Sequence, residues 1–191
     1  MILSIVAYPH PILKKKTVEI EPDYPDLDGF LSDMWETMYQ ADGIGLAAPQ
    51  VNRSLRLFVI DASILSEHHH PEAAGFKKTF INPTILIQEG EEELHNEGCL
   101  SFPGLHEEIQ RKSVIHIHYL DKNFQEFEER YDGILARIIQ HEYDHIEGIT
   151  MAERISPLRK MLLKRRLSDI ASGNIDVHYK MIFPAEKKKK R

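Results

Sequence analysis

The segment "GILARIIQHEYDHIEG", residues 133–148, constrains the fold most, because it predicts a buried helix that carries several ionisable groups. Its apolar residues fall on one side of a helix that begins near Gly133 and ends at Gly148. We therefore expect the rest of the chain to be arranged around this helix. The apolar residues are Ile134, Leu135, Ile138, Ile139 and Ile146.

Two histidines on this helix indicate a metal site. Successive residues turn by about 100° around a helix, so His141 and His145 differ by roughly 40° in direction and one turn in height. Both imidazoles can therefore reach one ion, with Glu142 beside an open coordination position. This is the HExxH pattern, in which the glutamate takes a proton from metal-bound water. Hydrogen-bonded core histidines are the alternative, but burying these imidazoles and carboxylates without a common partner would be costly.

A catalytic ion normally has three protein ligands, and the single cysteine is the candidate for the third. Cys99 lies in the segment "NEGCLSFPG". A free cysteine is most often an inert buried residue. A thiolate with two imidazoles, however, would form a site suited to Fe(II), Zn(II) or Ni(II) rather than Mg(II) or Ca(II). One cysteine also excludes an internal disulfide, which fits a reducing, cytoplasmic compartment.

The segment "GIGLAAPQ", residues 43–50, predicts a glycine loop that an extended peptide could approach. Its small residues leave the backbone accessible for main-chain hydrogen bonds. Gln50 adds an amide donor that can polarise a carbonyl oxygen. The segment lacks the spacing and the ending of phosphate-binding loops.

The remaining periodicities predict two further helices and several antiparallel strands. Helical spacing of apolar residues covers 26–40, and Ser156 followed by Pro157 starts a C-terminal helix that Gly173 stops. The polar segment 66–75, with His68–His70, reads as a solvated surface loop rather than a metal site. The predicted strands cover residues 55–61, 78–87, 113–121 and 125–133.

Length and composition indicate one folded domain. The chain has 191 residues, of which 42% are hydrophobic and 28% charged, and no apolar run is long enough to cross a bilayer. We expect residues 1–174 to form a single catalytic domain, with its C-terminal helix near 157–172, and residues 175–191 to form a basic tail. The net charge is −6 although the last five residues are all basic. Because the rest of the chain is therefore still more acidic, we expect no sequence-specific nucleic-acid partner.

The segments "GIGLAAPQ", "EGCLS" and "QHEYDH", in this order, closely resemble the three signature motifs of peptide deformylase. The resemblance extends to "DMWETMYQADG" and "FINP" and covers most of residues 1–155. It implies an α+β fold in which mixed, mainly antiparallel β-sheets surround a central metal-binding helix, followed by a C-terminal helix. It further implies that Cys99, His141 and His145 bind the ion, that Glu142 is the general acid/base, and that Gln50 and the Leu100 N–H hold the oxyanion.

The resemblance also implies a reaction and its partners. The expected enzyme is a metal-dependent hydrolase that removes the N-formyl group from the N-terminal methionine of newly synthesised proteins and releases formate. Fe(II) is the expected ion, while Zn(II), Ni(II) or Co(II) are tolerated. The substrates would be N-formylmethionyl nascent peptides, and the basic C-terminal region would contact the ribosome. The residues expected to line the methionine pocket and peptide groove are Ile44, Gly45, Gly98, Ile134 and Ile138.

Three positions near the motifs carry charged or titratable residues outside the expected ligand set. Arg137 stands where the family often has an apolar residue, and His106 stands where some relatives have arginine. Asp144 points away from the midline between the two histidines, so we expect it to pair with Arg111 and fix the helix against a strand.

Two other functions remain open at this point. A zinc metalloprotease that cuts internal peptide bonds would need the same helix, but it gives no role to "GIGLAAPQ" or Cys99. A metal-stabilised module that binds nascent chains without turnover is the non-enzymatic alternative.

Overall fold

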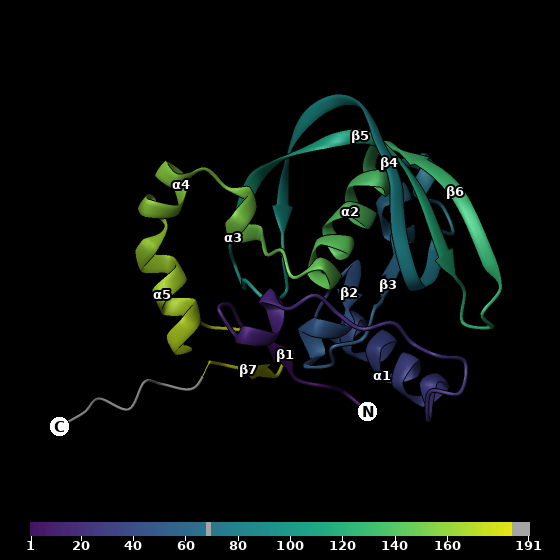
Figure 1. Ribbon diagram of the computed structural model, residues 1–191. Helices are drawn as coiled ribbons and strands as arrows, with labels where there is room; N and C mark the ends of the chain where they lie inside the picture. Colours follow the sequence, from purple (N-terminus) through teal and green to yellow (C-terminus); the bar gives the residue numbers. More distant parts are fainter. Residues whose placement is uncertain (68–69, 185–191) are drawn as a thin grey trace.

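A five-stranded antiparallel sheet with strand order β2-β3-β4-β5-β6 curves around helix α2 (Gly133–Glu147) in the computed structural model (Figure 1). The structure describes residues 1–67 and 70–184. A second sheet pairs β1 (Ile5–Val6) with β7 (Met181–Ile182) in parallel. The predicted fold class, α+β with mainly antiparallel sheets around a central helix, is confirmed. The strands of the larger sheet are β2 (Gly45–Ala47), β3 (Leu57–Asp61), β4 (Lys77–Gly98), β5 (His106–Leu120) and β6 (Glu126–Asp132).

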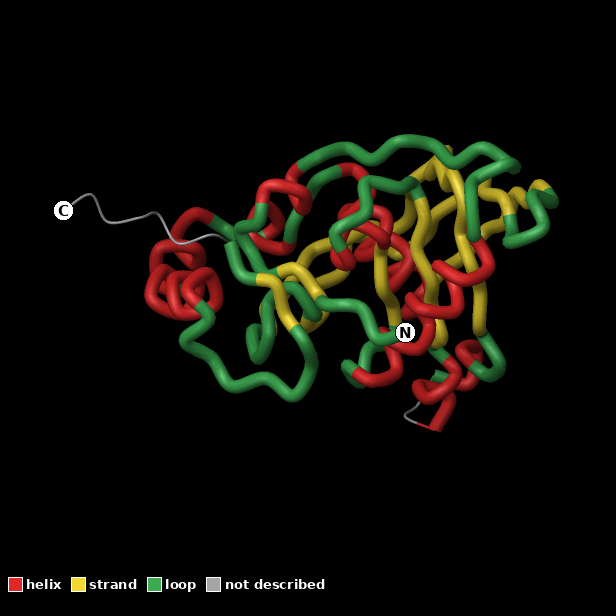
Figure 2. Tube along the Cα trace, turned by 90° about the horizontal axis from the view of Figure 1, so that it is seen from below, coloured by secondary structure: helices red, strands yellow, loops and turns green. Residues whose placement is uncertain are grey.

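Helices lie on both faces of the sheet because the side chains of β3 alternate between the faces. Leu57 and Val59 pack in the same apolar cluster as Met34 and Met38 of α1 (Leu27–Gln40). Phe58 and Ile60 pack instead with α2 and with apolar residues of β5. Buried on both faces, β3 holds the two helices at a fixed separation. Figure 2 shows α1 and α2 against the strands, with the C-terminal helices at the edge of the molecule.

Helix α2 has the predicted bounds, and its C-terminal end depends on a glycine. Gly148 follows the helix with φ 75°, in the left-handed region that glycine adopts without strain. A Cβ atom there would lie 2.8 Å from the carbonyl carbons of Lys14 and Lys15. The close approach lets the N-terminal segment cover the end of the helix.

The strand predicted at residues 78–87 is much longer in the structure. β4 runs from Lys77 to Gly98 and pairs with β5 as far as Gly98 opposite His106. Residues 86–96 of β4 are exposed and rich in glutamate, whereas the opposite part of β5 buries Ile109 and Arg111. This part of β4 has neither the alternation nor the composition that identifies a strand in a sequence. Its consequence is functional, because β4 ends directly before Cys99.

Other elements also differ from the prediction. Part of the expected glycine loop forms β2, which pairs with β3. β5 begins at His106 instead of Ser113. The single helix expected over 157–172 is two helices, α4 (Pro157–Leu162) and α5 (Lys164–Ser172), preceded by the short α3 (Met151–Arg154). The break at Leu163 lets Leu167 and Ile170 of α5 pack in the core while the apolar residues of α4 stay exposed.

The segment expected to be a tail is attached to the body as far as it is described. Residues 181–182 form β7, whose carbonyl at Ile182 accepts a hydrogen bond from Ala7 N–H at 2.8 Å. The lysine-rich end, residues 185–191, lies outside the described residues, as do His68 and His69 of the predicted loop. His70 contacts Glu72 at 3.1 Å, in keeping with a surface loop. Among the described helices, none is long and apolar enough to cross a membrane.

Candidate active site and metal centre

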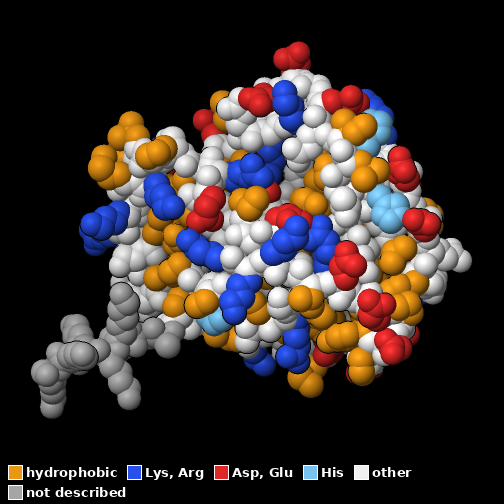
Figure 3. All heavy atoms as spheres, viewed as in Figure 1, with side chains coloured by type: hydrophobic (Ala, Val, Ile, Leu, Met, Phe, Trp, Pro, Cys, Tyr) orange, Lys and Arg blue, Asp and Glu red, His pale blue; other side chains and the backbone are white. Residues whose placement is uncertain are grey.

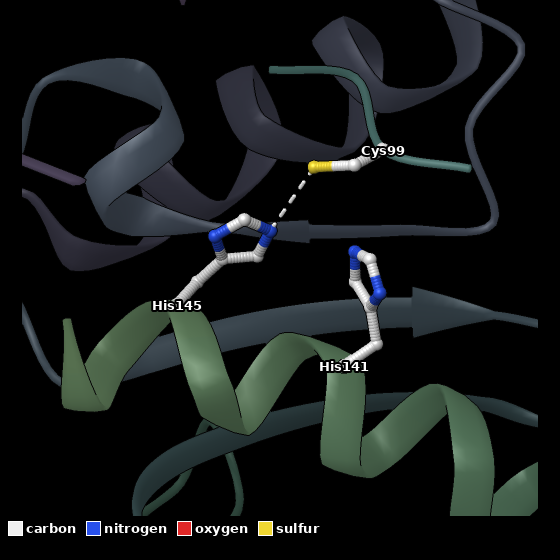
Figure 4. Close-up of side chains that lie close together, drawn as sticks. All are labelled: Cys99, His141 and His145. Atoms are coloured by element: carbon white, nitrogen blue, oxygen red, sulfur yellow. Dashed lines mark hydrogen bonds between the residues drawn. The ribbon is translucent and has the colours of Figure 1, made fainter. Parts of the chain in front are cut away.

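The structure brings together the three residues expected to bind a metal ion. The Cys99 Sγ atom and one nitrogen each of His141 and His145 all lie within 4.8 Å of one another. Figure 4 shows both rings extending from α2 toward the sulfur, which follows the end of β4. The His145 Nε2 atom lies 3.3 Å from the sulfur. A thiol and two imidazoles at this spacing fit a divalent transition-metal ion.

A carboxylate behind the histidines fixes the orientation of one ring. Glu97 contacts the Nδ1 atom of His141 at 2.9 Å. Because a proton on Nδ1 satisfies this carboxylate, the Nε2 atom of His141 is left as the ligand nitrogen. Burial alone would raise the pKa of Glu97, but hydrogen bonds from His141 and Arg111 outweigh it and lower the pKa well below its usual range. Glu97 is therefore an anion that holds the ring in place.

Two buried arginines neutralise this carboxylate. Arg111 donates to both oxygens of Glu97, at 2.7 and 2.9 Å. Arg137 donates to Glu97 Oε1 at 2.7 Å and to the backbone oxygen of Ile109 at 3.0 Å. Arg111 also donates to Asp144 at 2.7 Å, which is the ion pair expected from the sequence. Asp144 thus ties α2 to β5 from the side of the helix away from the sulfur.

Glu142 is a buried carboxylate at the wall of the site. Burial raises its pKa to about 7, against the opposing charges of His141 and Arg111. Its Oε2 atom is buried without a hydrogen-bond partner among the described residues. A Cβ atom at position 45 would lie 2.3 Å from its Oε1 atom, so only glycine leaves room for this carboxylate. An unpartnered buried carboxylate beside the ligands is poised for a proton that arrives with substrate or water.

The expected oxyanion donors, Gln50 and Leu100, lie next to Cys99. Ala47 N–H donates to the Oε1 atom of Gln50 at 2.9 Å, which turns the Nε2 atom toward Ser101 and Cys99. Leu100 follows the cysteine, and its N–H donates to no acceptor in the described parts of the chain. Gln50 and Leu100 therefore present one oriented amide and one free backbone donor.

One cavity of about 450 Å³ connects these groups. Its lining contains every residue expected to contact the peptide and every expected catalytic group. His145 lies outside the lining and is only 2% exposed, so it closes the floor behind His141. The expected residues in the lining are Ile44, Gly45, Gln50, Gly98, Cys99, Leu100, Ile134, Ile138, His141 and Glu142.

The sequence analysis assigned no role to Glu97, Arg137 or Tyr179. Glu97 stood in the quoted motif "EGCLS", two positions before the cysteine. Side chains two apart on a strand share a face, which would have placed Glu97 near the ligands. Arg137 lines the cavity and is buried, with its guanidinium paired with Glu97. Tyr179 lines the cavity from the C-terminal segment, where no sequence signal indicated a contact.

An HExxH helix whose two histidines meet a cysteine at the wall of a peptide-sized cavity is the arrangement of a metal-binding hydrolase. The family model described as polypeptide deformylase matches residues 2–161. The peptide deformylases of Christiangramia forsetii and Flavobacterium johnsoniae are each 46% identical over 98% of this chain and 99% of their own. The crystal structure of a Legionella pneumophila peptide deformylase, 34% identical, superposes with a TM-score of 0.79 over 91% of this chain and 98% of its own.

The chain belongs to the peptide deformylase family. A second solved relative, from Thermotoga maritima, is 37% identical with a TM-score of 0.73 and covers 82% of this chain. Both the sequence and the fold therefore identify an enzyme, a hydrolase of N-terminal protein processing.

Proposed function

We propose that this chain hydrolyses the N-formyl group of N-formylmethionyl nascent peptides, with Glu142 as general acid/base. Family membership supports the reaction. The observation that carries the residue roles is the shared cavity, which is lined by Glu142 and Gln50 together with Cys99 and His141. A formyl carbonyl placed between them would meet a proton acceptor and an amide donor at once.

The residues of the chain divide the chemistry between them. A divalent ion bound by Cys99, His141 and His145 would supply Lewis-acid activation of water and of the formyl carbonyl. Glu142, protonated and deprotonated with nearly equal ease near neutral pH, takes a proton from the attacking water and gives it to the leaving amine. Gln50 Nε2 and the Leu100 N–H stabilise the negative charge that develops on the carbonyl oxygen.

The apolar part of the cavity suits a methionine side chain. Ile44, Ile134 and Ile138 line it beside Glu142, and Ile138 is only 6% exposed. Gly45 and Gly98 line the cavity with bare backbone, which offers main-chain hydrogen bonds to an extended peptide, and their lack of a Cβ atom leaves room for the side chains of Glu142 and His106. Selection for the methionine end would therefore come from this apolar wall, and selection for formyl from the narrow space beside Gly45.

Resemblance to the family supports Fe(II) as the physiological ion, and Zn(II), Ni(II) and Co(II) fit the same ligands. A thiolate beside iron is sensitive to oxygen. Protein purified without oxygen should contain one equivalent of iron and lose both iron and activity in air.

Formate release is the test of the proposed reaction. Formyl-Met-Ala-Ser should be hydrolysed with stoichiometric formate, while an unformylated, internally quenched peptide of the same composition should remain intact. Cleavage of the quenched peptide would instead favour the metalloprotease. Tight binding of formyl-Met-Ala-Ser without turnover, in protein loaded with each of the four metals, would favour the binding module.

The surface of the C-terminal helices supports a ribosomal partner. Leu158, Met161 and Leu162 of α4 are each more than 60% exposed, and Figure 3 shows basic side chains beside them. Ribosomal phosphates and an apolar contact would complement this surface, which fits action on nascent chains in the cytoplasm. A variant with Lys160, Lys164 and Arg165 changed to glutamate should pellet less with ribosomes at low salt. Equal pelleting would remove these helices from the proposal.

A further inference from the structure

The C-terminal segment contacts the residues that carry the oxyanion donor. Tyr179 donates from its hydroxyl to the backbone oxygen of Leu100 at 2.8 Å. The same tyrosine lines the cavity and packs with Leu100 in the apolar cluster around α1. It comes from near the opposite end of the chain from β1, and Figure 1 shows β7 crossing beside β1 below the site.

The three peptide groups from Cys99 to Phe102 are each fixed by a different bond. The Cys99 oxygen accepts from Phe102 N–H at 2.8 Å. The Leu100 oxygen accepts from Tyr179, and the Ser101 oxygen accepts from Tyr8 N–H at 3.0 Å. The hydroxyl of Tyr179 is thus the one side-chain group in this set. Since the Leu100 N–H must point at the developing oxyanion, the orientation of these peptide planes sets how well it donates.

Two further contacts flank Tyr179. β7 begins two residues later and pairs with the fully buried residues of β1, and the oxygen of the intervening Lys180 accepts from Ile5 N–H at 2.8 Å, so the backbone is anchored on its C-terminal side. Preceding it, His178 lies 3.1 Å from Asp42 of the cavity wall, but both side chains are more than half exposed, so this contact adds little. The strand pair is therefore what holds the tyrosine beside the cavity.

We propose that Tyr179 is a positioning residue, which orients the Leu100 N–H for the oxyanion by holding the Leu100 carbonyl. The proposal rests on the proposed function, because the oxyanion belongs to that reaction. It assigns the C-terminal segment a role in catalysis, beyond any docking role of the neighbouring helices. Tyr179 does not itself touch the reacting atoms. Its hydroxyl fixes the Leu100–Ser101 peptide group, so its effect must pass through the Leu100 Cα atom to the adjacent Cys99–Leu100 peptide group, which carries the N–H.

The test is Tyr179→Phe, which keeps the ring and its packing and removes only the hydroxyl. Deleting an oxyanion donor outright costs about 10²- to 10³-fold in kcat, so a donor that is only misaligned should cost about tenfold. We expect kcat for formyl-Met-Ala-Ser to fall by about tenfold with KM changed less than about twofold. In NMR spectra of the full chain, the Ser101 amide resonance should shift because the lost bond polarised its peptide group, and the Leu100 amide resonance should shift because the adjacent peptide group reorients.

Tyr119→Phe is the matched control. Tyr119 is buried, whereas Tyr179 is half-buried, and the Tyr119 hydroxyl donates to Glu129 at 2.6 Å on the sheet, away from the cavity lining. This variant should lose as much thermal stability as Tyr179→Phe or more, with kcat and the two amide resonances unchanged. An equal loss of kcat in both variants would mean that general destabilisation is responsible and would overturn the positioning role.

The wild-type assay separates this proposal from the proposed function. If the wild type releases no formate with any metal, the proposed function fails and the positioning role fails with it. If the wild type is active and Tyr179→Phe retains its full kcat, the positioning role alone is overturned.

Discussion

Replacing Glu142 by glutamine should reduce kcat/KM for formyl-Met-Ala-Ser by about 10³-fold, within the range of roughly 10² to 10⁴ typical of a lost general acid/base. Glutamine keeps the size of the side chain but cannot accept and return a proton. The ligand atoms lie on Cys99, His141 and His145, so metal content should stay at one equivalent. Metal analysis and steady-state kinetics on the same preparation measure both quantities.

Two comparison variants make this prediction specific. Glu147→Gln changes a glutamate at the end of the same helix whose carboxylate pairs with Arg56 and Lys16, and it should leave kcat/KM unchanged. Gly45→Ala reaches the same carboxylate by another route, since the added methyl group would lie 2.3 Å from Glu142 Oε1. It should cost about 10²-fold, as expected for a misplaced catalytic group. Loss of metal in parallel with activity in Glu142→Gln would contradict the acid/base role.

Replacing Glu97 by alanine should destabilise the protein by about 3–5 kcal/mol, the typical cost of removing one partner from a buried ion pair. Arg111 and Arg137, each only 6% exposed, would both lose their ion pair with this carboxylate. For a chain of this size the loss corresponds to a fall in Tm on the order of 10 °C. Thermal and urea unfolding, each with and without a chelator, measure the effect apart from metal binding.

The control for Glu97 is an ion pair of the same kind at the surface. Glu126 contacts His118 at 2.6 Å, but its side chain is 74% exposed. Exposed pairs contribute roughly 0–1 kcal/mol, so Glu126→Ala should lower Tm by no more than about 2–4 °C. Glu97→Gln should fall between the two, because an amide can still accept from His141. If Glu97→Ala proves as stable as Glu126→Ala, the carboxylate does not hold the network together.

The central helix could be predicted from the sequence because its evidence is local. Apolar spacing and a terminal glycine set the bounds of α2, and the four-residue spacing of His141 and His145 placed both rings on one side. The approach of Cys99 to these rings is different in kind, since it depends on the path of the chain. It could be anticipated only because a catalytic ion needs a third ligand and the chain has one thiol.

The features that escaped prediction depend on contacts between distant segments. The exposed half of β4 buries none of its residues from 86 to 96, and it is stabilised by pairing with β5, which buries Ile109 and Arg111 there. In the sequence, Arg137 is a charged residue at a position where an apolar one is expected. In the structure its charge is paired with the carboxylate of Glu97, which comes from a distant strand. The pairing of β1 with β7 involves two residues from each end of the chain, too few to form a pattern.

That pairing joins residues 5–6 to residues 181–182, which lie far apart in the sequence. The segment after Cys99 is held by Tyr8, next to β1, and by Tyr179, next to β7. Both bonds therefore depend on the same two-stranded sheet. A substitution that weakens this sheet should disturb both supports of the segment at once, although neither strand lines the cavity.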